Sequence, residues 1–255
     1  MPIAFNRSGF AVALSFGAVG AAIGGSPTVC FPVVSTPLAP GTFRFYLDDV
    51  SGDGIEDLIT VSSGEIRLAS GLPGGGFGSV SDVFQFDSLP VSVATGDLNG
   101  DALTDLISAN LVLSSSGELA VLLNNGEGGF DLQASGPAFL RPYDIDLADF
   151  DNDGDLDLFV GNKGGANELW LNDGSGNFTA ASGGPTGGIV STRTAAFADV
   201  DGDGDIDLFV GNYGGANELW LNDGSGGFTA ASGGAGASGS GLDGKNFQRS
   251  GTHRP

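Results

Sequence analysis

The sequence predicts an all-β protein, a β-propeller assembled from four copies of one unit. Three observations lead to this fold class. A loop with aspartates at alternate positions recurs at intervals of 48 to 52 residues, short apolar stretches separated by glycine-rich turns lie between these loops, and no stretch has the helical apolar period. We expect four blades of four antiparallel strands each, either closed as a four-blade ring or forming an incomplete propeller.

The four blades are expected at residues 42–88, 89–136, 137–187 and 188–232. Strands are predicted at 43–47, 58–61, 65–68 and 77–86 in the first blade, at 91–95, 106–108, 118–123 and 130–132 in the second, and at 194–198, 208–210, 218–221 and 228–230 in the fourth. The third blade should follow the fourth, because residues 164–176 return unchanged as 214–226. The Asn-Asp-Gly-Ser-Gly clusters in these segments are typical of hairpin turns.

Several predicted strands are apolar on both faces. Leu219 and Leu221 point to one side of their strand, and Trp220 points to the other. Such a pattern favours a sheet covered on both faces, as the blades of a propeller are by their neighbours. Trp170 and Trp220 are equivalent in the duplicated segments, which favours packing between blades; a platform for a ligand is the alternative.

The recurring loop has the composition of a calcium site. Its complete form carries carboxylates at positions 1, 3, 5, 7 and 9 and a glycine at position 6. Two unit charges about 4 Å apart repel by ~4 kcal/mol at an effective dielectric constant of about 20, so this crowding favours a bound cation. Oxygen ligands around a sharp glycine turn are the donors that Ca²⁺ prefers. The candidate ligands are Asp49, Ser51, Asp53, Ile55 and Asp57; Asp97, Asn99, Asp101, Leu103 and Asp105; Asp149, Asp151, Asp153, Asp155 and Asp157; and Asp199, Asp201, Asp203, Asp205 and Asp207.

The first two loops are expected to bind more weakly than the last two. Ser51 removes one carboxylate from the first loop, and Ala102 takes the place of the turn glycine in the second. Ile55 and Leu103 at position 7 indicate that this position contributes its backbone carbonyl. Metal-free Asp-Gly turns are the alternative. An EF-hand is excluded by the missing glutamate at position 12 and by flanking strands, and Mg²⁺ seldom uses an all-protein cage.

These residues carry a resemblance to a known family. The pattern Asp-x-Asp-x-Asp-Gly-x-x-Asp between strands, four times from residue 42 to about residue 232, resembles the FG-GAP/VCBS repeats, the calcium-binding blades of integrin α-chain-like propellers. The resemblance implies up to four Ca²⁺ ions, one per repeat, each in the loop between the first two strands of a blade. It also implies extracellular adhesion or recognition. Propellers of that family usually have seven blades, whereas four are recognisable here.

Composition excludes several classes of function. The chain has 31 acidic against 9 basic residues, which argues against nucleic acid and anionic membranes as partners. About half of the acids lie in the four loops, so the charge reflects the metal sites. Cys30 and His253 are single, so neither a disulfide nor a zinc site is expected. With no evident nucleophile and base pair, we expect no enzymatic activity.

The two ends of the chain have different compositions. Arg7 followed by the apolar run 10–23 predicts a signal peptide over residues 1–24, with a buried glycine-rich pair of strands as the alternative; the run is too short and glycine-rich to span a membrane. Residues 25–41 are expected to be a linker or an N-terminal strand. Residues 233–255 begin with a Gly/Ala/Ser stretch and are expected to be a disordered tail.

The sequence therefore predicts a secreted, cell-surface or periplasmic calcium-binding repeat protein that acts in adhesion or recognition of a protein or a glycan, with Ca²⁺ in a structural role. The alternative is an accessory or structural repeat region of a larger surface or polysaccharide-acting protein. Neither the ligand nor the oligomeric state follows from the repeats.

Overall fold

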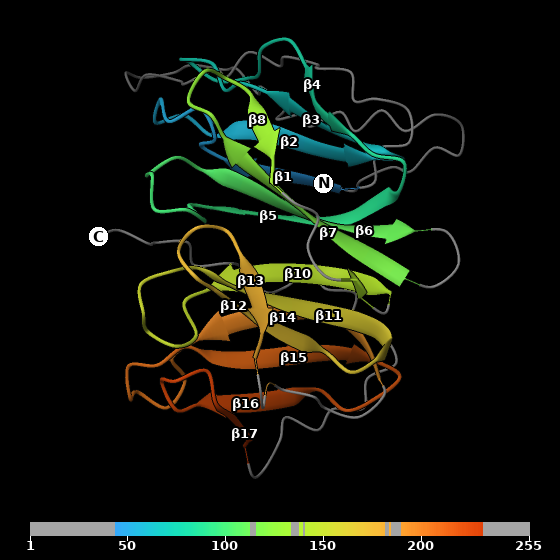
Figure 1. Ribbon diagram of the computed structural model, residues 1–255, viewed down its shortest axis with the longest axis vertical. Helices are drawn as coiled ribbons and strands as arrows, with labels where there is room; N and C mark the ends of the chain where they lie inside the picture. The colour runs from blue at the N-terminus through green and yellow to red at the C-terminus, as the bar shows by residue number, and fades with distance from the viewer. Residues whose placement is uncertain are drawn as a thin grey trace, which may run out of the picture. The chain divides into compact units, whose positions relative to one another are not determined.

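The computed structural model describes residues 44–112, 116–133, 138–139, 141–181, 184 and 190–231 (Figure 1). These residues form strands, turns and loops and contain no helix, which confirms the all-β prediction. A helix long and apolar enough to cross a membrane is accordingly not found within these ranges. The predicted signal peptide 1–24, the linker 25–41 and the tail 233–255 lie outside the described residues.

The chain divides into two compact units. The first comprises Met1–Phe139 together with Gly174–Asn177, and the second comprises Leu140–Asp173 and Phe178–Pro255. Each unit contains two antiparallel sheets of the kind expected for a blade, with the four main strands in sequence order. Neighbouring strands in the chain are therefore neighbours in space, as short hairpin connections require.

The first unit contains the strands β1 to β9. One sheet runs β1 (Arg44–Asp48), β2 (Asp57–Ser62), β3 (Glu65–Ala69) and β4 (Ser81–Gln85). The other runs β5 (Leu89–Gly96), β6 (Asp105–Val112), β7 (Ser116–Asn124) and β8 (Phe130–Leu132), and the two-residue β9 (Ala138–Phe139) also pairs with β7.

The second unit contains the strands β10 to β17. Its sheets are β10 (Pro142–Ala148), β11 (Asp157–Gly165), β12 (Glu168–Asn172) and β13 (Phe178–Ala180), followed by β14 (Val190–Ala198), β15 (Asp207–Tyr213), β16 (Glu218–Asn222) and β17 (Phe228–Ala230). A short pairing of Lys163 with Ser191 and Gly165 with Val190 joins β11 to β14. The two sheets thereby form one eight-stranded sheet.

The fourth strand of the first blade begins later than the sequence predicts. The predicted span starts at Phe77, whereas β4 starts at Ser81. Phe77 makes only an isolated bridge with Gly71, and the N–H of Gly78 donates to the carbonyl of Ser70. The three glycines Gly74, Gly75 and Gly76 have positive φ angles, so the chain turns tightly here before the strand starts. Closure of the four blades into a ring stays a prediction.

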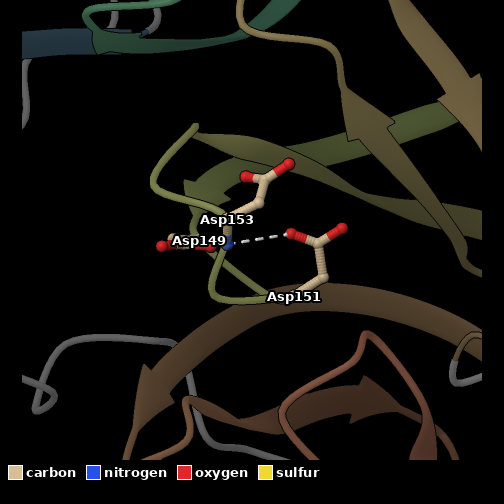
Figure 2. Close-up of side chains that lie close together, drawn as sticks. All are labelled: Asp149, Asp151 and Asp153. Carbon is tan, nitrogen blue, oxygen red and sulfur yellow. Dashed lines mark hydrogen bonds between the residues drawn. The ribbon is translucent and has the colours of Figure 1, made fainter.

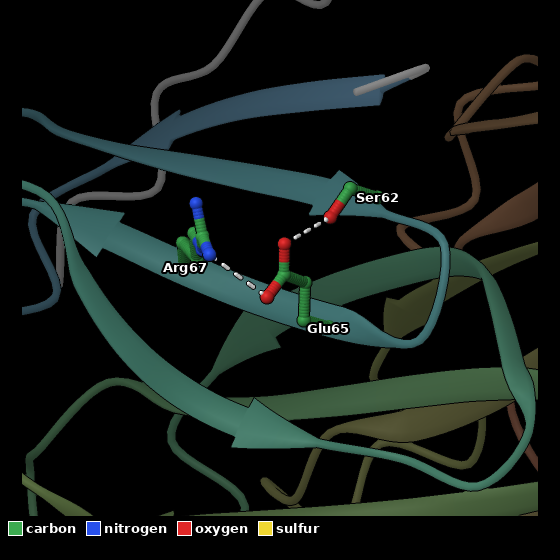
Figure 3. A network of polar contacts seen from close by, with 3 residues as sticks. All are labelled: Ser62, Glu65 and Arg67. Carbon is green, nitrogen blue, oxygen red and sulfur yellow. Dashed lines mark hydrogen bonds and ion pairs between the residues drawn. The ribbon is translucent and has the colours of Figure 1, made fainter. Parts of the chain in front are cut away.

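A polar network holds the β2–β3 hairpin (Figure 3). The hydroxyl of Ser62 donates to Glu65 Oε1 over 2.9 Å, and the other carboxylate oxygen of Glu65 lies 3.0 Å from the Arg67 guanidinium. Ser62 is buried, so its hydroxyl needs this acceptor. Glu65 and Arg67 stand two residues apart on β3, so their side chains lie on the same face of the strand and can form this ion pair.

The residue at position 2 of the first three loops contributes to the core. Val50 belongs to a buried cluster with residues of β2, β3, β5, β6 and β7, and Phe150 belongs to one with residues of β11, β12 and β15. Phe150 makes edge contacts with the rings of Phe197 and Phe228, at centroid distances of 5.1 and 5.7 Å. Trp220 packs against the same cluster, in agreement with its predicted role in packing between blades.

Replacing Phe150 with alanine should lower the free energy of unfolding by about 3–5 kcal/mol, because the ring is fully buried and its loss leaves a cavity. The matched control is Val200→Ala at position 2 of the fourth loop, where the side chain is 53% exposed. This change should cost less than about 0.5 kcal/mol. Urea denaturation of both variants measures the difference, and equal costs would contradict the assigned core.

Candidate metal centres

Each candidate loop connects the first two strands of a blade. The loops lie between β1 and β2, β5 and β6, β10 and β11, and β14 and β15. Position 9 of the loop is in every case the first residue of the second strand: Asp57, Asp105, Asp157 and Asp207. The position of this residue in a paired strand fixes one end of the loop, and the remaining carboxylates lie on the turn before it.

The aspartate at position 1 accepts hydrogen bonds from the backbone of its own loop. Asp49 accepts from the N–H groups of Gly52, Asp53 and Gly54 over 2.8, 3.1 and 2.7 Å. Asp97, Asp149 and Asp199 each accept an N–H from position 6 in the same way. These bonds bend the chain around the first carboxylate, as expected for an Asx-type turn.

Positions 3 and 5 continue this pattern. In the last two loops Asp153 and Asp203 each accept the N–H of position 7 over 3.0 Å. Asp151 and Asp201 accept the N–H of position 5 over 3.3 and 3.2 Å. Every odd-numbered side chain up to position 5 therefore turns toward the inside of the loop.

Two of the loops bring carboxylates close enough together to share one cation. Ligand oxygens of Asp149, Asp151 and Asp153 lie within 4.8 Å of one another, and Figure 2 shows the three side chains gathered on one turn. Oxygens of Asp199, Asp201 and Asp207 form the corresponding group in the fourth loop. In the first two loops Ser51 and Asn99 stand at position 3, so these loops offer fewer carboxylates.

The environment of these carboxylates disfavours their negative charge. The pKa of Asp151 is raised, first by partial burial and then by the nearby charge of Asp153. Desolvation also raises the pKa of Asp201, with the Asp203 and Asp207 carboxylates acting in the same direction. A bound cation would offset both effects.

A buried acceptor atom in the third loop tests whether these residues fit a metal ion. Asp149 Oδ1 is shielded from solvent and has no hydrogen-bond partner among the described residues. A buried, unsatisfied carboxylate oxygen is costly unless a cation or a donor reaches it. Because it lies in the same loop as Asp151 and Asp153, and because the donors are all oxygens, the set fits Ca²⁺.

The aspartate at position 9 has a structural role that the sequence does not reveal. Asp157 is fully buried and accepts N–H groups from Phe150 over 3.0 Å and from Asn172 over 2.9 Å. Asp207 likewise accepts from Val200 and Asn222. The carboxylate therefore connects its loop to the third strand of the blade, and only its remaining lone pairs are left for a cation.

Burial raises the pKa of Asp157 to about 6, even though the hydrogen bonds from Asn172 and Phe150 act to lower it. The pKa of Asp105 is raised for the same reason. A raised pKa means that the charged form costs folding free energy as the pH rises through that value. A cation in the loop would lower this cost.

The side chain at position 7 of the fourth loop points away from its own loop. Asp205 Oδ1 accepts the side-chain amide of Asn152 in the third loop over 2.8 Å. Asn152 has a φ angle of 59°, and the other loops have glycines at this position. Asparagine tolerates this backbone region better than other residues with a side chain. The predicted backbone carbonyl ligand at position 7 stays a prediction.

A recurrent asparagine at the end of the third strand is a second feature that the sequence does not assign. Asn222 Nδ2 donates to the carbonyls of Phe150 and Ile206 over 2.8 and 3.1 Å. Asn124 donates to those of Val50 and Thr104 over 2.9 and 3.1 Å. Its signal in the sequence is its recurrence in the last three blades as Asn124, Asn172 and Asn222, before Gly-containing turns where asparagine is also an ordinary turn residue. Gly71 takes this place in the first blade.

Ala102, which takes the place of the turn glycine in the second loop, adopts the backbone conformation of that glycine. Ala102 has a φ angle of 66°, whereas Gly54, Gly154 and Gly204 occupy the same position in the other loops with φ between 84° and 100°. For a residue with a Cβ atom this conformation costs of the order of 1 kcal/mol.

Comparison with known families identifies the repeats. The model of the FG-GAP-like repeat matches residues 49–108, 104–160, 149–210 and 199–245. The chain therefore belongs to the FG-GAP-like repeat family. Comparison with curated protein sequences found no match.

Solved structures with a similar fold include a lectin of Agrocybe aegerita that specifically recognises non-reducing terminal N-acetylglucosamine. It matches with a TM-score of 0.51 and 24% identity over 73% of this chain and 51% of the lectin chain. BBS1N, in its complex with ARL6DN, matches with a TM-score of 0.50 and 12% identity over 74% of this chain and 56% of the other. The chain thus spans about half of each, and the likeness shows the fold alone.

The structural role of position 9 predicts a difference between two neighbouring aspartates. In calcium-free protein Asp157→Asn should lower the free energy of unfolding by about 1–3 kcal/mol, because an amide group then faces a buried N–H. Asp155→Asn is the control and should change it by less than about 0.5 kcal/mol, since Ile55 and Leu103 stand at its position in other loops. Equal effects in chemical denaturation would refute this role.

Proposed function

We propose that the chain is a calcium-stabilised repeat module for recognition of an extracellular partner. The observation that carries this proposal is the group of Asp149, Asp151 and Asp153, which contains a buried oxygen without a partner. No reaction follows from a set of carboxylates that fits a metal ion. The proposed role of the loops is therefore to hold the blades in place, so that other surfaces of the protein can bind.

In this proposal Ca²⁺ supplies positive charge to each loop, and the chain supplies the ligands. Positions 1, 3 and 5 of the last two loops contribute carboxylates. Position 7 contributes a carbonyl oxygen, and position 9 holds the loop against the third strand. The first two loops use Ser51 and Asn99 at position 3 and bind more weakly.

The expected stabilisation follows from mass action. Extracellular modules bind Ca²⁺ with dissociation constants of about 10⁻⁴–10⁻³ M. At a tenfold excess over that constant, each site adds about 1.4 kcal/mol to the free energy of unfolding. The two complete loops would add about 3 kcal/mol, and four sites about 5–6 kcal/mol. This range reaches the stability of a typical domain, which is about 5–15 kcal/mol.

The recognition role is supported by the repeat family and is proposed for a protein or glycan partner. Secretion, closure of the four blades and the absence of enzymatic activity are parts of the same proposal. A structural region of a larger surface protein is the second candidate, because the chain spans about half of the lectin and BBS1N chains it resembles. Sedimentation in Ca²⁺ separates the two: a compact monomer supports a self-contained module, and concentration-dependent association supports the second candidate.

Removal of calcium should lower the melting temperature of the full chain by many degrees. A double variant, Asp151→Asn with Asp201→Asn, should lose most of the difference between millimolar CaCl₂ and EDTA, because it removes one ligand from each complete loop. The matched control, Asp131→Asn with Glu127→Gln, lies outside the candidate loops and should keep it. An equal melting temperature of the unmodified chain in both buffers would exclude the proposed role of the metal.

A further inference from the structure

The structure assigns to the second unit a binding surface for an acidic glycan, formed by Arg141, Tyr143, Lys163, Arg193 and Tyr213. We call these five residues the basic-aromatic surface. It deepens the proposed recognition function and rests on it, because it names the ligand class and the place of contact. The candidate calcium loops take no part in it.

The centre of this surface is an arginine between two tyrosine rings. The guanidinium carbon of Arg193 lies 4.5 Å from the ring centroid of Tyr143 and 4.8 Å from that of Tyr213. Stacking on aromatic faces holds the planar guanidinium in one orientation and leaves the in-plane N–H donors at its edge. Such a fork matches the two oxygens of a carboxylate or a sulfate.

The strand pairing places the other cations beside this stack. Lys163 on β11 and Tyr213 on β15 both face Ser191 on the intervening β14. With about 4.8 Å between neighbouring strands, their Cα atoms lie about 10 Å apart. The N–H of Lys163 donates to the carbonyl of Arg141 over 2.9 Å, which brings the exposed Arg141 to the same sheet region. Three cations and two rings thus share one end of these strands.

These cations are not neutralised within the protein. In the part of the chain that the structure describes, Arg141, Lys163 and Arg193 have no ion pair, whereas Arg67 is paired with Glu65. Two acids of the neighbouring blades are engaged elsewhere: Glu168 accepts from the amide of Asn162, and Glu218 from the indole N–H of Trp220. Unpaired basic groups in a chain of net charge −22 are available for an external anion.

The acidic loops lie too far away to cancel this local charge. Asp207 and Tyr213 are the two ends of β15, which at ~3.3 Å per residue places their Cα atoms about 20 Å apart. The Debye length is about 8 Å at physiological ionic strength, so the loop charges are largely screened at this distance. The loop carboxylates therefore repel an anionic group at Arg193 only weakly.

The fold does not require these residue types. Tyr143 and Arg193 both occupy positions where the strand register shifts, at the start of β10 and of β14. The equivalent shift in β5 surrounds Val91, an apolar residue. Arg141 has a φ angle of 53°, an uncommon conformation for a residue with a side chain. Bulges and backbone strain often direct side chains toward a functional surface.

A glycan fits this surface better than an acidic peptide. At Ser191, β14 is paired on both sides, with Lys163 of β11 and Tyr213 of β15, and β15 is also paired with β16. At this end of the strands a peptide therefore finds no free edge of β14 or β15 for main-chain hydrogen bonds. Tyr213 is 65% exposed and offers its ring to the apolar C–H face of a sugar, while Arg193 receives the acidic group.

The test uses the calcium-loaded full chain and a hyaluronan octasaccharide, with the methyl ester of the same octasaccharide as the uncharged probe. In calorimetry the hyaluronan should bind at least tenfold more tightly than its ester, and less tightly as NaCl rises. Arg193→Gln and Tyr213→Ala should each weaken binding about tenfold, because each removes one of the two contacts that fix the sugar. Arg67→Gln, at an ion-paired arginine on β3, is the control and should bind within twofold of the unmodified chain.

Three results would overturn the inference. Equal binding of hyaluronan and its ester would exclude recognition of the charge. Unchanged binding by folded Arg193→Gln and Tyr213→Ala would place recognition on another surface and leave the proposed function standing. Tighter binding of a poly-glutamate peptide than of hyaluronan would replace the glycan with a peptide. The calcium-dependent melting temperature, measured on the same samples, decides the role of the loops separately.

Discussion

The mutual repulsion of carboxylates crowded into short loops is the constraint on which the rest of the structure depends. In each loop the backbone N–H groups reduce this repulsion by turning toward the side chains, and in the third loop one oxygen of Asp149 is left without a donor. Hydrogen bonds from neutral donors cannot cancel several full charges in a few residues. This is why we propose a cation at the centre of the loops, which connect the first two strands of each blade.

Successive residues of the loop contact different parts of the blade. Positions 1, 3 and 5 face the inside of the loop, whereas position 2 enters the core in the first three loops, as Val50 and Phe150 do. Position 9 then accepts backbone N–H groups from the loop and from the third strand. An asparagine at the end of that strand reaches the carbonyl of position 2 in the preceding blade, as Asn222 reaches Phe150. One short segment thus links metal ligands, core packing and contact between blades.

The sequence predicts those features that repeat along the chain. The four loops, most of the strands and the strained Ala102 follow from periodicity and turn chemistry, because each repeat is an independent copy of the same signal. The start of β4 is missed because the sequence pattern places the first residue of the strand at the apolar Phe77, which still belongs to the turn that contains Gly74, Gly75 and Gly76. The strand β9 has two residues, too few for an alternation of apolar and polar residues that would predict a strand.

Features that depend on contacts between residues far apart in the chain could not be predicted from the sequence. A carboxylate pattern does not say that Asp157 is occupied by backbone donors on both oxygens, because this requires the partner Asn172 on another strand. In the same way, Tyr143 and Tyr213 lie 50 and 20 residues from Arg193 in the sequence, and only the pairing of β10, β11, β14 and β15 brings the three together. The hydrogen bonds of Asp157 and the stacking of Arg193 both depend on the pairing register of strands, which local composition does not fix.

The most direct test of the central claim is a calorimetric titration of CaCl₂ into metal-free chain at neutral pH. At least two ions should bind per chain with millimolar or tighter dissociation constants. Variants of Asp151 and Asp201 should each remove one of them. The contradicting result is a chain that stays folded but binds no ion at Ca²⁺ concentrations up to tenfold above those dissociation constants. The protein alone would then compensate the crowded carboxylates, and the account would be wrong.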